Sequence, residues 1–287
     1  MCGICGIFNF EKKNKISPEI IKGMSDIMQH RGPDEDGYYV QDNIGFGHKR
    51  LSIIDLKSGH QPIFNEEKTC CIIFNGEIYN FLEVRKILES KGHVFRTLSD
   101  TEVIIHSYEE YGTECVKHLR GMFAFAIWDS RRNALFLARD RLGKKPLYYY
   151  FDKGCFIFAS EAKSIFRSGM IKAEVNENYL DEFLSLGYVT SPNTLFKDIK
   201  KIPPGSVLTV KEGKIRINEY WFLNEYRTGD LTMQNCQDRL VSLLEESIKY
   251  RLISDVPLGA FLSGGIDSSV ITGLMSSLSG KPVKTFS

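Results

Sequence analysis

The spacing of apolar positions divides the chain into two parts. Between residues 122 and 159, β-type apolar runs alternate with short turn-rich segments, and the runs cover 123–128, 134–138, 147–151 and 155–159. Short strands with no long helices between them favour antiparallel pairing. After residue 230 the pattern changes, because Leu240, Leu244 and Ile248 follow helical spacing and predict an amphipathic helix over 234–252.

The first 120 residues mix strands with amphipathic helices. We expect strands at 3–9, 37–41, 44–48, 51–54 and 69–74, and helices at 17–29, from about 81, and at 101–111. Ser17 and Asp100 are the expected N-caps of the first and last of these helices. Asn75-Gly76-Glu77 should end a strand and lead into a helix. Strands at both ends of the region, with helices between them, indicate two antiparallel sheets packed face to face with helices outside.

The remaining pattern predicts a second, α/β architecture. Helices at 161–168 and 178–186 precede a hairpin formed by 207–210 and 215–220. A buried strand over 256–262, a loop, a helix to about 278 and a strand at 283–286 then form a β-loop-α-β unit, which is typical of the start of a parallel doubly wound sheet. We therefore expect one domain over 2–205, a connecting segment to about 230, and a second domain over 231–287.

Composition and charge narrow the class of protein. Of the 287 residues 43% are apolar and 25% are charged, and the net charge is only +1. We therefore expect no nucleic-acid partner and no anionic membrane surface, and no run of about 18 apolar residues predicts a membrane span. Seven cysteines, an odd number without paired zinc-type spacing, indicate reduced thiols and a cytoplasmic protein.

Cys2 is the first candidate for chemistry. If Met1 is removed, Cys2 carries a thiol and a free α-amino group on one residue. The thiolate is the attacking species, and an α-amino group with a pKa of about 7.7–8.0 can accept the thiol proton near neutral pH. The alternative is that Cys2 and Cys5 are small buried apolar residues of a strand.

The loop at 263–269 is the second candidate. Gly264 and Gly265 follow a predicted strand, so the backbone can approach a ligand closely. The following helix offers free N–H groups and the positive end of its dipole to an anion. The loop lacks the Gly-Lys-Ser/Thr ending of the Walker loop. Its serines suit a pyrophosphate, with Mg²⁺ near Asp267; an ordinary Ser/Gly turn is the alternative.

Nine segments, in order along the whole chain, resemble the glutamine-hydrolysing asparagine synthetase family. They are Met1–Ile4, His30–Asp34, Arg50–Asp55, Asn75–Asn80, Ser99–Glu102, Arg139–Gly143, Pro146–Tyr148, Ser160–Lys163 and Ser263–Ser269. The resemblance implies an α+β fold, a four-layer αββα sandwich of the N-terminal-nucleophile glutaminase type. A doubly wound α/β ATP-pyrophosphatase domain would follow. Because that family's synthetase domain extends well beyond Ser287, we expect this half to be incomplete here.

The same resemblance implies roles for individual residues. Cys2 would attack the glutamine side-chain amide, while the Asn75 side chain and the Gly76 N–H form the oxyanion hole. Arg50 would hold the substrate α-carboxylate, and Glu77 and Asp100 would surround its α-amino group. The remaining binding residues would be Leu51 and Ile53 for glutamine, and Leu262, Ser263, Gly264, Gly265, Asp267 and Ser268 for ATP or pyrophosphate.

Simpler alternatives exist for several of these residues. They are a surface ion pair for Arg50, a helix N-cap for Asp100 and a hairpin turn for Asn75-Gly76. We interpret His30 as structural, with Arg31 and Asp34 bracing a loop. Cys5, Cys70 and Cys71 lie in apolar runs and are expected to be buried and inert.

The predicted function is that of a glutamine-dependent amidotransferase. Ammonia from glutamine would amidate an ATP-activated carboxylate, converting aspartate to asparagine, with ATP and Mg²⁺ serving the synthetase half and no cofactor serving the glutaminase half. One alternative is a different acceptor, such as a sugar acid of surface polysaccharides. Another is a glutaminase-only or non-catalytic fragment. A homodimer or a separately encoded remainder of the synthetase domain is a possible partner.

Overall fold

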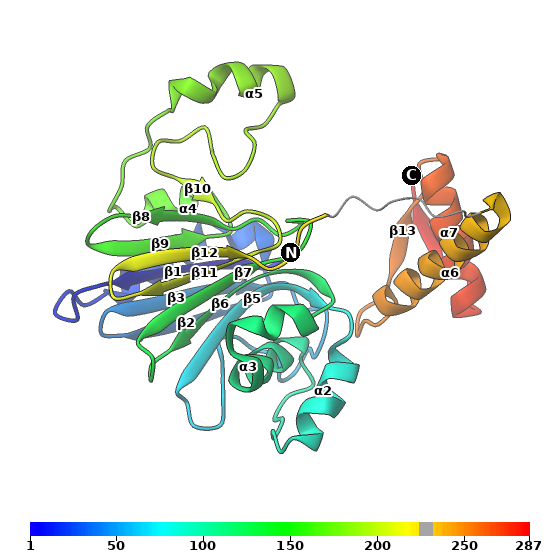
Figure 1. Ribbon diagram of the computed structural model, residues 1–287, viewed down its shortest axis with the longest axis horizontal. Helices are drawn as coiled ribbons and strands as arrows, with labels where there is room; N and C mark the ends of the chain where they lie inside the picture. The colour runs from blue at the N-terminus through cyan, green and yellow to red at the C-terminus, as the bar shows by residue number, and fades with distance from the viewer. Residues whose placement is uncertain (224–231) are drawn as a thin grey trace. The chain divides into compact units, whose positions relative to one another are not determined.

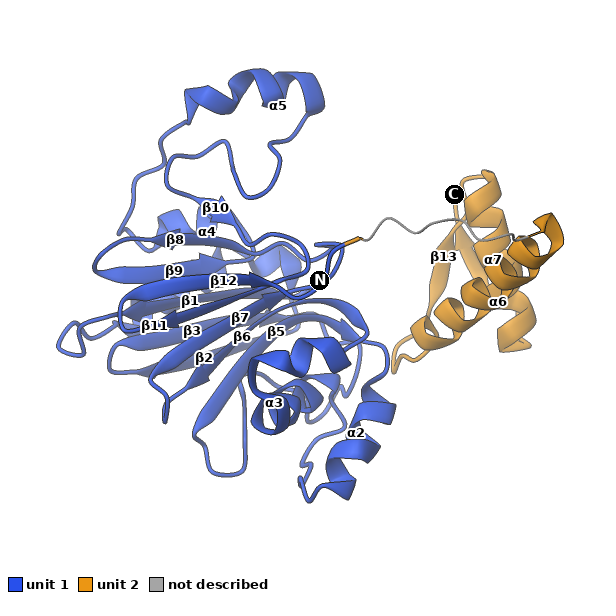
Figure 2. Cartoon of the chain, viewed as in Figure 1, with its two compact units in different colours: residues 1–222 blue, residues 223–287 orange. Residues whose placement is uncertain are grey.

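A computed structural model describes residues 1–223 and 232–287. The chain forms two compact units, Met1–Phe222 and Leu223–Ser287 (Figure 2). The expected connecting segment, 206–230, lies partly outside the described residues. Its first part forms a hairpin within the first unit, so the expected boundary at residue 205 lies just before that hairpin.

Two six-stranded antiparallel sheets form the first unit (Figure 1). The first has the order β10-β8-β9-β1-β3-β2, with β1 Gly3–Asn9, β2 Glu35–Gln41, β3 Ile44–Arg50, β8 Tyr148–Phe151, β9 Cys155–Ala159 and β10 Lys200–Lys201. The second has the order β12-β11-β7-β6-β5-β4, with β4 Ile63–Phe64, β5 Cys70–Ile78, β6 Gly121–Asp129, β7 Ala134–Arg139, β11 Ser206–Lys211 and β12 Lys214–Glu219.

Three apolar cores hold the layers together. The central core lies between the sheets and contains Phe8, Phe46, Trp128, Phe156 and Phe158. The two outer cores lie under pairs of helices: α1 (Pro18–Asp26) and α4 (Ala162–Arg167) against the first sheet, α2 (Phe81–Ser90) and α3 (Asp100–Tyr111) against the second. Helices and sheets thus form the four layers αββα, as the sequence predicts. A short helix, α5 (Leu180–Leu186), lies in the loop before β10.

Three local predictions are wrong. β5 does not end at Phe74 but continues through Asn75 and Gly76 to Ile78, because β6 pairs with it over that whole length. The hairpin alternative for Asn75-Gly76 is therefore excluded. Residues 51–54 form no strand. Asp100 is the first residue of α3 rather than its N-cap, which is Ser99, whose Oγ accepts the Thr101 N–H at 3.2 Å.

The described part of the second unit, residue 223 and residues 232–287, forms two helices and a two-stranded parallel sheet. The elements are α6 (Met233–Arg251), β13 (Gly259–Phe261), α7 (Ile266–Ser279) and β14 (Lys284–Phe286). The strand predicted over 256–262 is shorter than expected and is not buried, since β13 has β14 as its one neighbouring strand and the Phe261 side chain is 86% exposed. No described helix is long and apolar enough to cross a membrane.

Candidate functional site

A cavity of about 260 Å³ lies beside Cys2. All eight residues predicted for the glutaminase site line it, namely Cys2, Arg50, Leu51, Ile53, Asn75, Gly76, Glu77 and Asp100. Its volume is just below the roughly 300–1,000 Å³ of pockets for drug-sized ligands, so it suits a ligand as small as an amino acid. These residues come from the start of β1, the end of β3, the loop after it, β5 and the start of α3.

Backbone contacts fix the position of Cys2 just before β1. The Arg31 Nε donates to the Cys2 carbonyl at 2.9 Å, and the Leu51 N–H lies 3.4 Å from Cys2 Sγ. Burial raises the pKa of the Cys2 thiol, whereas the Leu51 N–H and the Arg50 charge oppose this shift. The thiol therefore needs a base to become a nucleophile at neutral pH. Met1 also lines the cavity.

The α-amino group of Met1 lies in an environment that lowers its pKa. Desolvation lowers the pKa of the α-amino group of Met1, and the charges of Lys145 and Arg31 lower it further. The charge of Cys2 opposes this shift, and the amine that could accept the thiol proton, that of Cys2, becomes free only if Met1 is removed.

Asn75 is the strongest indication of a ligand in the cavity. Its side chain is completely buried, and neither its amide nitrogen nor its amide oxygen has a hydrogen-bond partner among the described residues. Such a group costs about 1–3 kcal/mol when left unsatisfied, so native structures rarely keep one without a use. An amide N–H₂ group in the wall of a cavity that a thiol also lines can donate to a developing oxyanion.

The hydrogen-bond pattern of the sheet turns the Gly76 N–H outward. Gly76 lies opposite Phe123 of β6, and both backbone groups of Phe123 bond to Asp140 on the far side, at 2.8 and 3.2 Å. Two residues directly opposite each other in an antiparallel pair either both point their backbone N–H and C=O groups toward the partner strand or both point them away from it. Gly76 therefore directs its N–H away from β6. A Cβ at this position would lie 2.2 Å from the Met122 carbonyl oxygen, so only glycine fits.

The residues on either side of Gly76 support this direction. The Phe74 N–H donates to Gln61 Oε1 at 2.7 Å, and the Ile78 N–H donates to Asp100 Oδ2 at 2.9 Å. Both N–H groups leave β5 on the side away from β6. Gly76 lies between Phe74 and Ile78, and β4 does not extend far enough to pair with it. The Gly76 N–H therefore faces the cavity, which Gln61, Phe74 and Asp100 also line.

Arg50 lines the cavity within a fixed set of contacts. One terminal nitrogen lies 3.0 and 3.1 Å from the two Glu35 carboxylate oxygens, and the other donates to the carbonyls of Ile54 and Asp55 at 3.1 and 2.6 Å. The guanidinium is 95% buried, so it is not a surface ion pair. These contacts hold a planar cation at the cavity wall, where a carboxylate can bind to it.

Two carboxyl groups lie at another part of the wall. Burial raises the pKa of Asp100 to about 7, and the charge of Glu77 adds to this shift, while the Ile78 N–H opposes it. An ammonium group bound beside Asp100 would favour its ionised form, because the added positive charge offsets the desolvation.

Sequence reasoning missed several residues of the cavity wall. Lys145 is 96% buried, and burial lowers its pKa while the charges of Glu77 and Cys2 oppose that shift. Lys145 lies between two segments that resemble the family, Arg139–Gly143 and Pro146–Tyr148, and this position is the sequence signal that could have identified it. Gln61 and Thr101 form a bonded pair, with Gln61 Nε2 donating to the Thr101 hydroxyl at 3.3 Å. The wall also includes Ile54, Gly59, Phe74, Ser99 and Met122.

Other residues that we interpret as structural make contacts outside the cavity wall. His30 and Arg31 both contact the Glu161 carboxylate, at 2.9 and 3.1 Å, and Asp34 accepts the Ser52 N–H at 2.8 Å. The cysteines interpreted as inert, Cys5, Cys70 and Cys71, are all buried.

The second predicted loop lies in the second unit. Gly265 is the N-cap of α7 and provides no side-chain cap, and Gly264 has a φ of +79° with open space where a Cβ would be. Ser263 and Ser268 bring their hydroxyl oxygens to 3.1 Å. Asp267 lies in the first helical turn, and Leu262 donates its N–H to the Phe286 carbonyl at 2.8 Å. Uncapped N–H groups and hydroxyls are donors that fit a phosphate.

Comparison with known families agrees with this geometry. Residues 1–221 match the family described as glutamine amidotransferase domain, and residues 239–287 match asparagine synthase. The first match covers most of the chain, which therefore belongs to the glutamine amidotransferase domain family. This confirms the class that the cavity and the αββα layers indicate.

The most similar relatives include asparagine synthetases, so the resemblance found in the sequence is confirmed. The chain is 42% identical over 277 residues to glutamine-hydrolyzing asparagine synthetase 3 of Bacillus subtilis, covering 96% of this chain and 45% of that protein. It is 36% identical to asparagine synthetase B of Escherichia coli, covering 99% and 46% respectively. The chain thus spans a little under half the length of these relatives.

Solved structures include chains with a similar fold. The glutamine phosphoribosylpyrophosphate amidotransferase from B. subtilis aligns with a TM-score of 0.58 at 17% identity, covering 99% of this chain and 65% of that one. At this identity the likeness concerns the fold alone.

We expect Asp100→Asn to stabilise the protein while weakening glutamine binding. The folded pKa of about 7 lies above the ordinary value of 3.8, so Asp100 costs stability increasingly as pH rises through this window. At pH 8 the variant should be more stable by at most roughly 4 kcal/mol, because the pKa is raised by about 3 units at 1.36 kcal/mol each, and at pH 4 its stability should be almost unchanged. The KM for glutamine should rise at least about tenfold, the loss of roughly one charge-assisted contact.

Thermal unfolding at pH 4 and pH 8, with steady-state kinetics at pH 8, tests this expectation. Asp198→Asn is the matched control, because Asp198 is exposed at a φ of +61°, which asparagine tolerates. An equal change in Tm at both pH values would show that the Asp100 carboxylate is not desolvated as described.

Proposed function

We propose that the first unit hydrolyses glutamine to glutamate and ammonia. The observation that carries the proposal is the buried, unpartnered amide of Asn75, in a cavity that also holds Cys2 and the Gly76 N–H. Family membership and the asparagine synthetase relatives support the same activity.

In this mechanism Cys2 acts after Met1 is removed. Its α-amino group accepts the thiol proton, and Sγ bonds to the side-chain amide carbon of glutamine. The carbonyl oxygen becomes an oxyanion that accepts hydrogen bonds from Asn75 Nδ2 and the Gly76 N–H. When the C–N bond breaks, the α-ammonium group returns the proton to the leaving nitrogen, and ammonia departs. Water then hydrolyses the thioester to glutamate and frees the thiol.

Binding of glutamine would use both ends of the cavity. The α-carboxylate would contact the Arg50 guanidinium, and the α-ammonium group would lie against Asp100 and Glu77. With the ammonium bound, Asp100 would be ionised at neutral pH, because the added charge offsets the desolvation that raises its pKa. Leu51 and Ile53 would line the apolar part of the pocket.

The second unit would belong to a synthetase that uses the ammonia. We propose a doubly wound ATP-pyrophosphatase domain over 231–287, whose α7 N-terminus and Ser263–Ser268 loop would hold ATP or pyrophosphate, with Mg²⁺ near Asp267. ATP would activate a carboxylate for amidation, and the relatives' names favour aspartate as that acceptor.

Two substitutions should separate binding from chemistry. Asn75→Ala should lower kcat by about 10²–10³ with little change in KM, because its contact strengthens as the oxyanion forms. Arg50→Ala should chiefly raise KM, since the α-carboxylate is held equally in ground and transition states. Ammonia release at varied glutamine concentration measures both parameters.

The control for Asn75→Ala is Asn43→Ala. Asn43 is also buried, but its amide donates to the Asn9 carbonyl, and it does not line the cavity. Asn43→Ala should leave kcat unchanged. The reverse pattern, with KM raised by Asn75→Ala and kcat lowered by Arg50→Ala, would reject the assigned roles.

A polypeptide of these 287 residues should release ammonia but make no acyl-adenylate. A doubly wound sheet needs further βα units to enclose its nucleotide. In residues 232–287 Ile248 is the only buried apolar side chain, and Ile266 beside the loop is 83% exposed. ATP–pyrophosphate exchange with aspartate and Mg²⁺ should therefore stay at background while glutaminase activity is present. Aspartate-dependent exchange by this polypeptide would contradict the expectation.

A further inference from the structure

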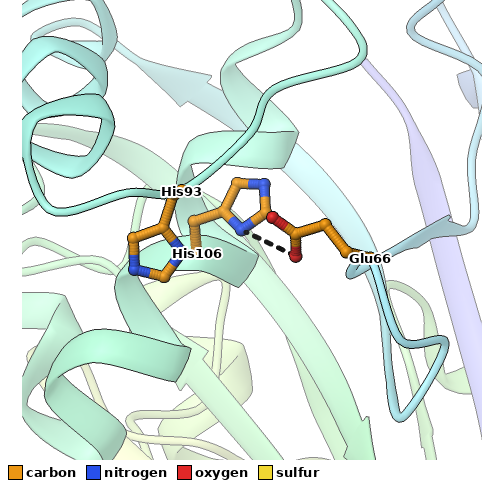
Figure 3. Close-up of side chains that lie close together, drawn as sticks. All are labelled: Glu66, His93 and His106. Carbon is orange, nitrogen blue, oxygen red and sulfur yellow. Dashed lines mark ion pairs between the residues drawn. The ribbon is translucent and has the colours of Figure 1, made fainter.

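A second cluster of chemically capable side chains lies outside the cavity. Glu66 is in the turn between β4 and β5, His93 is in the segment between α2 and α3, and His106 is on α3 (Figure 3). One donor atom from each residue lies within 4.8 Å of the others. None of the three lines the cavity or enters the proposed hydrolysis.

Glu109 completes a set of four donors. Its Oε2 lies 2.9 Å from His106 Nδ1 and 3.9 Å from His93 Nδ1, so both imidazoles direct Nδ1 to one carboxylate oxygen. Glu66 Oε2 lies 3.7 Å from the same His106 Nδ1. Zinc bonds of 2.0–2.2 Å in a tetrahedron separate neighbouring donors by about 3.4 Å. These three distances, 2.9, 3.7 and 3.9 Å, bracket that value, and Glu66, His93 and His106 each place one donor atom within 4.8 Å of the others.

The opposite nitrogen of each imidazole faces a further carboxylate. Glu102 Oε1 lies 3.7 Å from His106 Nε2, and Glu110 Oε2 lies 3.5 Å from His93 Nε2. Metal-binding histidines commonly donate their other N–H to a carboxylate in this way, which fixes the tautomer and raises the basicity of the ligand nitrogen.

His106 and Glu102, two residues of this arrangement, are buried and held in place. The His106 side chain is 1% exposed, and its Nε2 is buried without a hydrogen-bond partner among the described residues. Glu102 is held in place by the N–H groups of Arg96 and Thr97, both at 2.8 Å. If Nδ1 bound a metal, Nε2 would carry the proton, and Glu102 would be its nearest acceptor.

The charge balance also calls for a cation. Three carboxylates lie within 4 Å of the His106 ring nitrogens, those of Glu66 and Glu109 at Nδ1 and that of Glu102 at Nε2. His93 adds an imidazole on the remaining side. Several carboxylates around two imidazoles favour a divalent cation at this position, and its binding would be tighter where the imidazoles are neutral.

We propose that Glu66, His93, His106 and Glu109 form a structural site for a divalent transition-metal ion of the zinc type. Four protein donors leave no open position for a substrate, which is typical of structural sites. The ion would join α3 to the segments that precede α3 and β5. α3 begins at Asp100, about 9 Å along the helix from His106 at 1.5 Å per residue, so the ion would steady the helix that presents Asp100 to the cavity.

Zinc titration of the 287-residue chain tests the proposal directly. Cys2→Ala and Cys236→Ser form the background, because these are the two cysteines that are not buried and either thiol could bind zinc. We expect one zinc per chain after desalting, with a higher Tm in its presence and tighter binding at pH 8 than at pH 6. X-ray absorption should show nitrogen and oxygen ligands at about 2.0–2.2 Å and no sulfur.

Variants at the partly exposed ligands provide the decisive comparison. His93→Gln and Glu66→Gln should each weaken zinc binding at least about tenfold and abolish the zinc-dependent rise in Tm. His118→Gln is the matched control, since His118 stacks on Tyr111 outside the cluster. Because both variants sit on surface segments, folding can be checked by their Tm without metal. Absence of stoichiometric zinc, or binding unchanged in both variants, would overturn the proposal and leave a cluster held by the His106 proton.

Discussion

The register of β5 against β6 determines the geometry of the site, because it decides which residues of β5 direct their N–H groups toward β6 and which direct them away. Because Phe123 bonds to Asp140 on its far side, Gly76 opposite it must point its N–H away from β6. Asn75 precedes Gly76 in the strand, and its side chain leaves the strand on one face of the sheet, whereas the Gly76 N–H leaves it along the sheet. One strand segment thus supplies two donors of different kinds to one cavity, and a shift of one residue would remove both.

The packing of the rest of the first unit keeps that strand in place. The apolar core between the sheets fixes β5 through Ile73 on the same face as Asn75. On the other face the Phe74 and Ile78 side chains pack under α2 and α3. This burial has an electrostatic cost, visible in the raised pKa values of Cys2 and Asp100. Such a cost is expected where a site is arranged for a charged ligand that compensates it.

Much of the fold and of the site follows from the sequence. Alternating and helical spacing predicted nearly every element, and the eight residues chosen for the glutaminase site all line one cavity. The local errors have physical causes. The Asn75-Gly76 sequence is typical of the end of a strand, but β5 continues past these two residues because β6 pairs with it as far as Ile78. The apolar run 256–262 predicts a buried strand, but burial depends on neighbours, and β13 is exposed.

Other features are invisible to pattern analysis because they depend on distant segments. Lys145 reaches the cavity wall from a turn-rich stretch with no periodicity of its own. The Glu66, His93 and His106 cluster joins three segments with no recognisable ligand spacing. Only the packing of α3 against the second sheet brings them together.

The central claim is that Cys2 supplies both the nucleophile and its base. The most direct test compares two preparations of the chain, one beginning at Cys2 and one retaining Met1, each verified by intact mass. Ammonia release from glutamine should come from the processed form alone, and Cys2→Ala should be inactive but folded. Equal hydrolysis by the processed and the Met1-retaining protein would contradict the account, because a blocked α-amino group cannot accept the thiol proton.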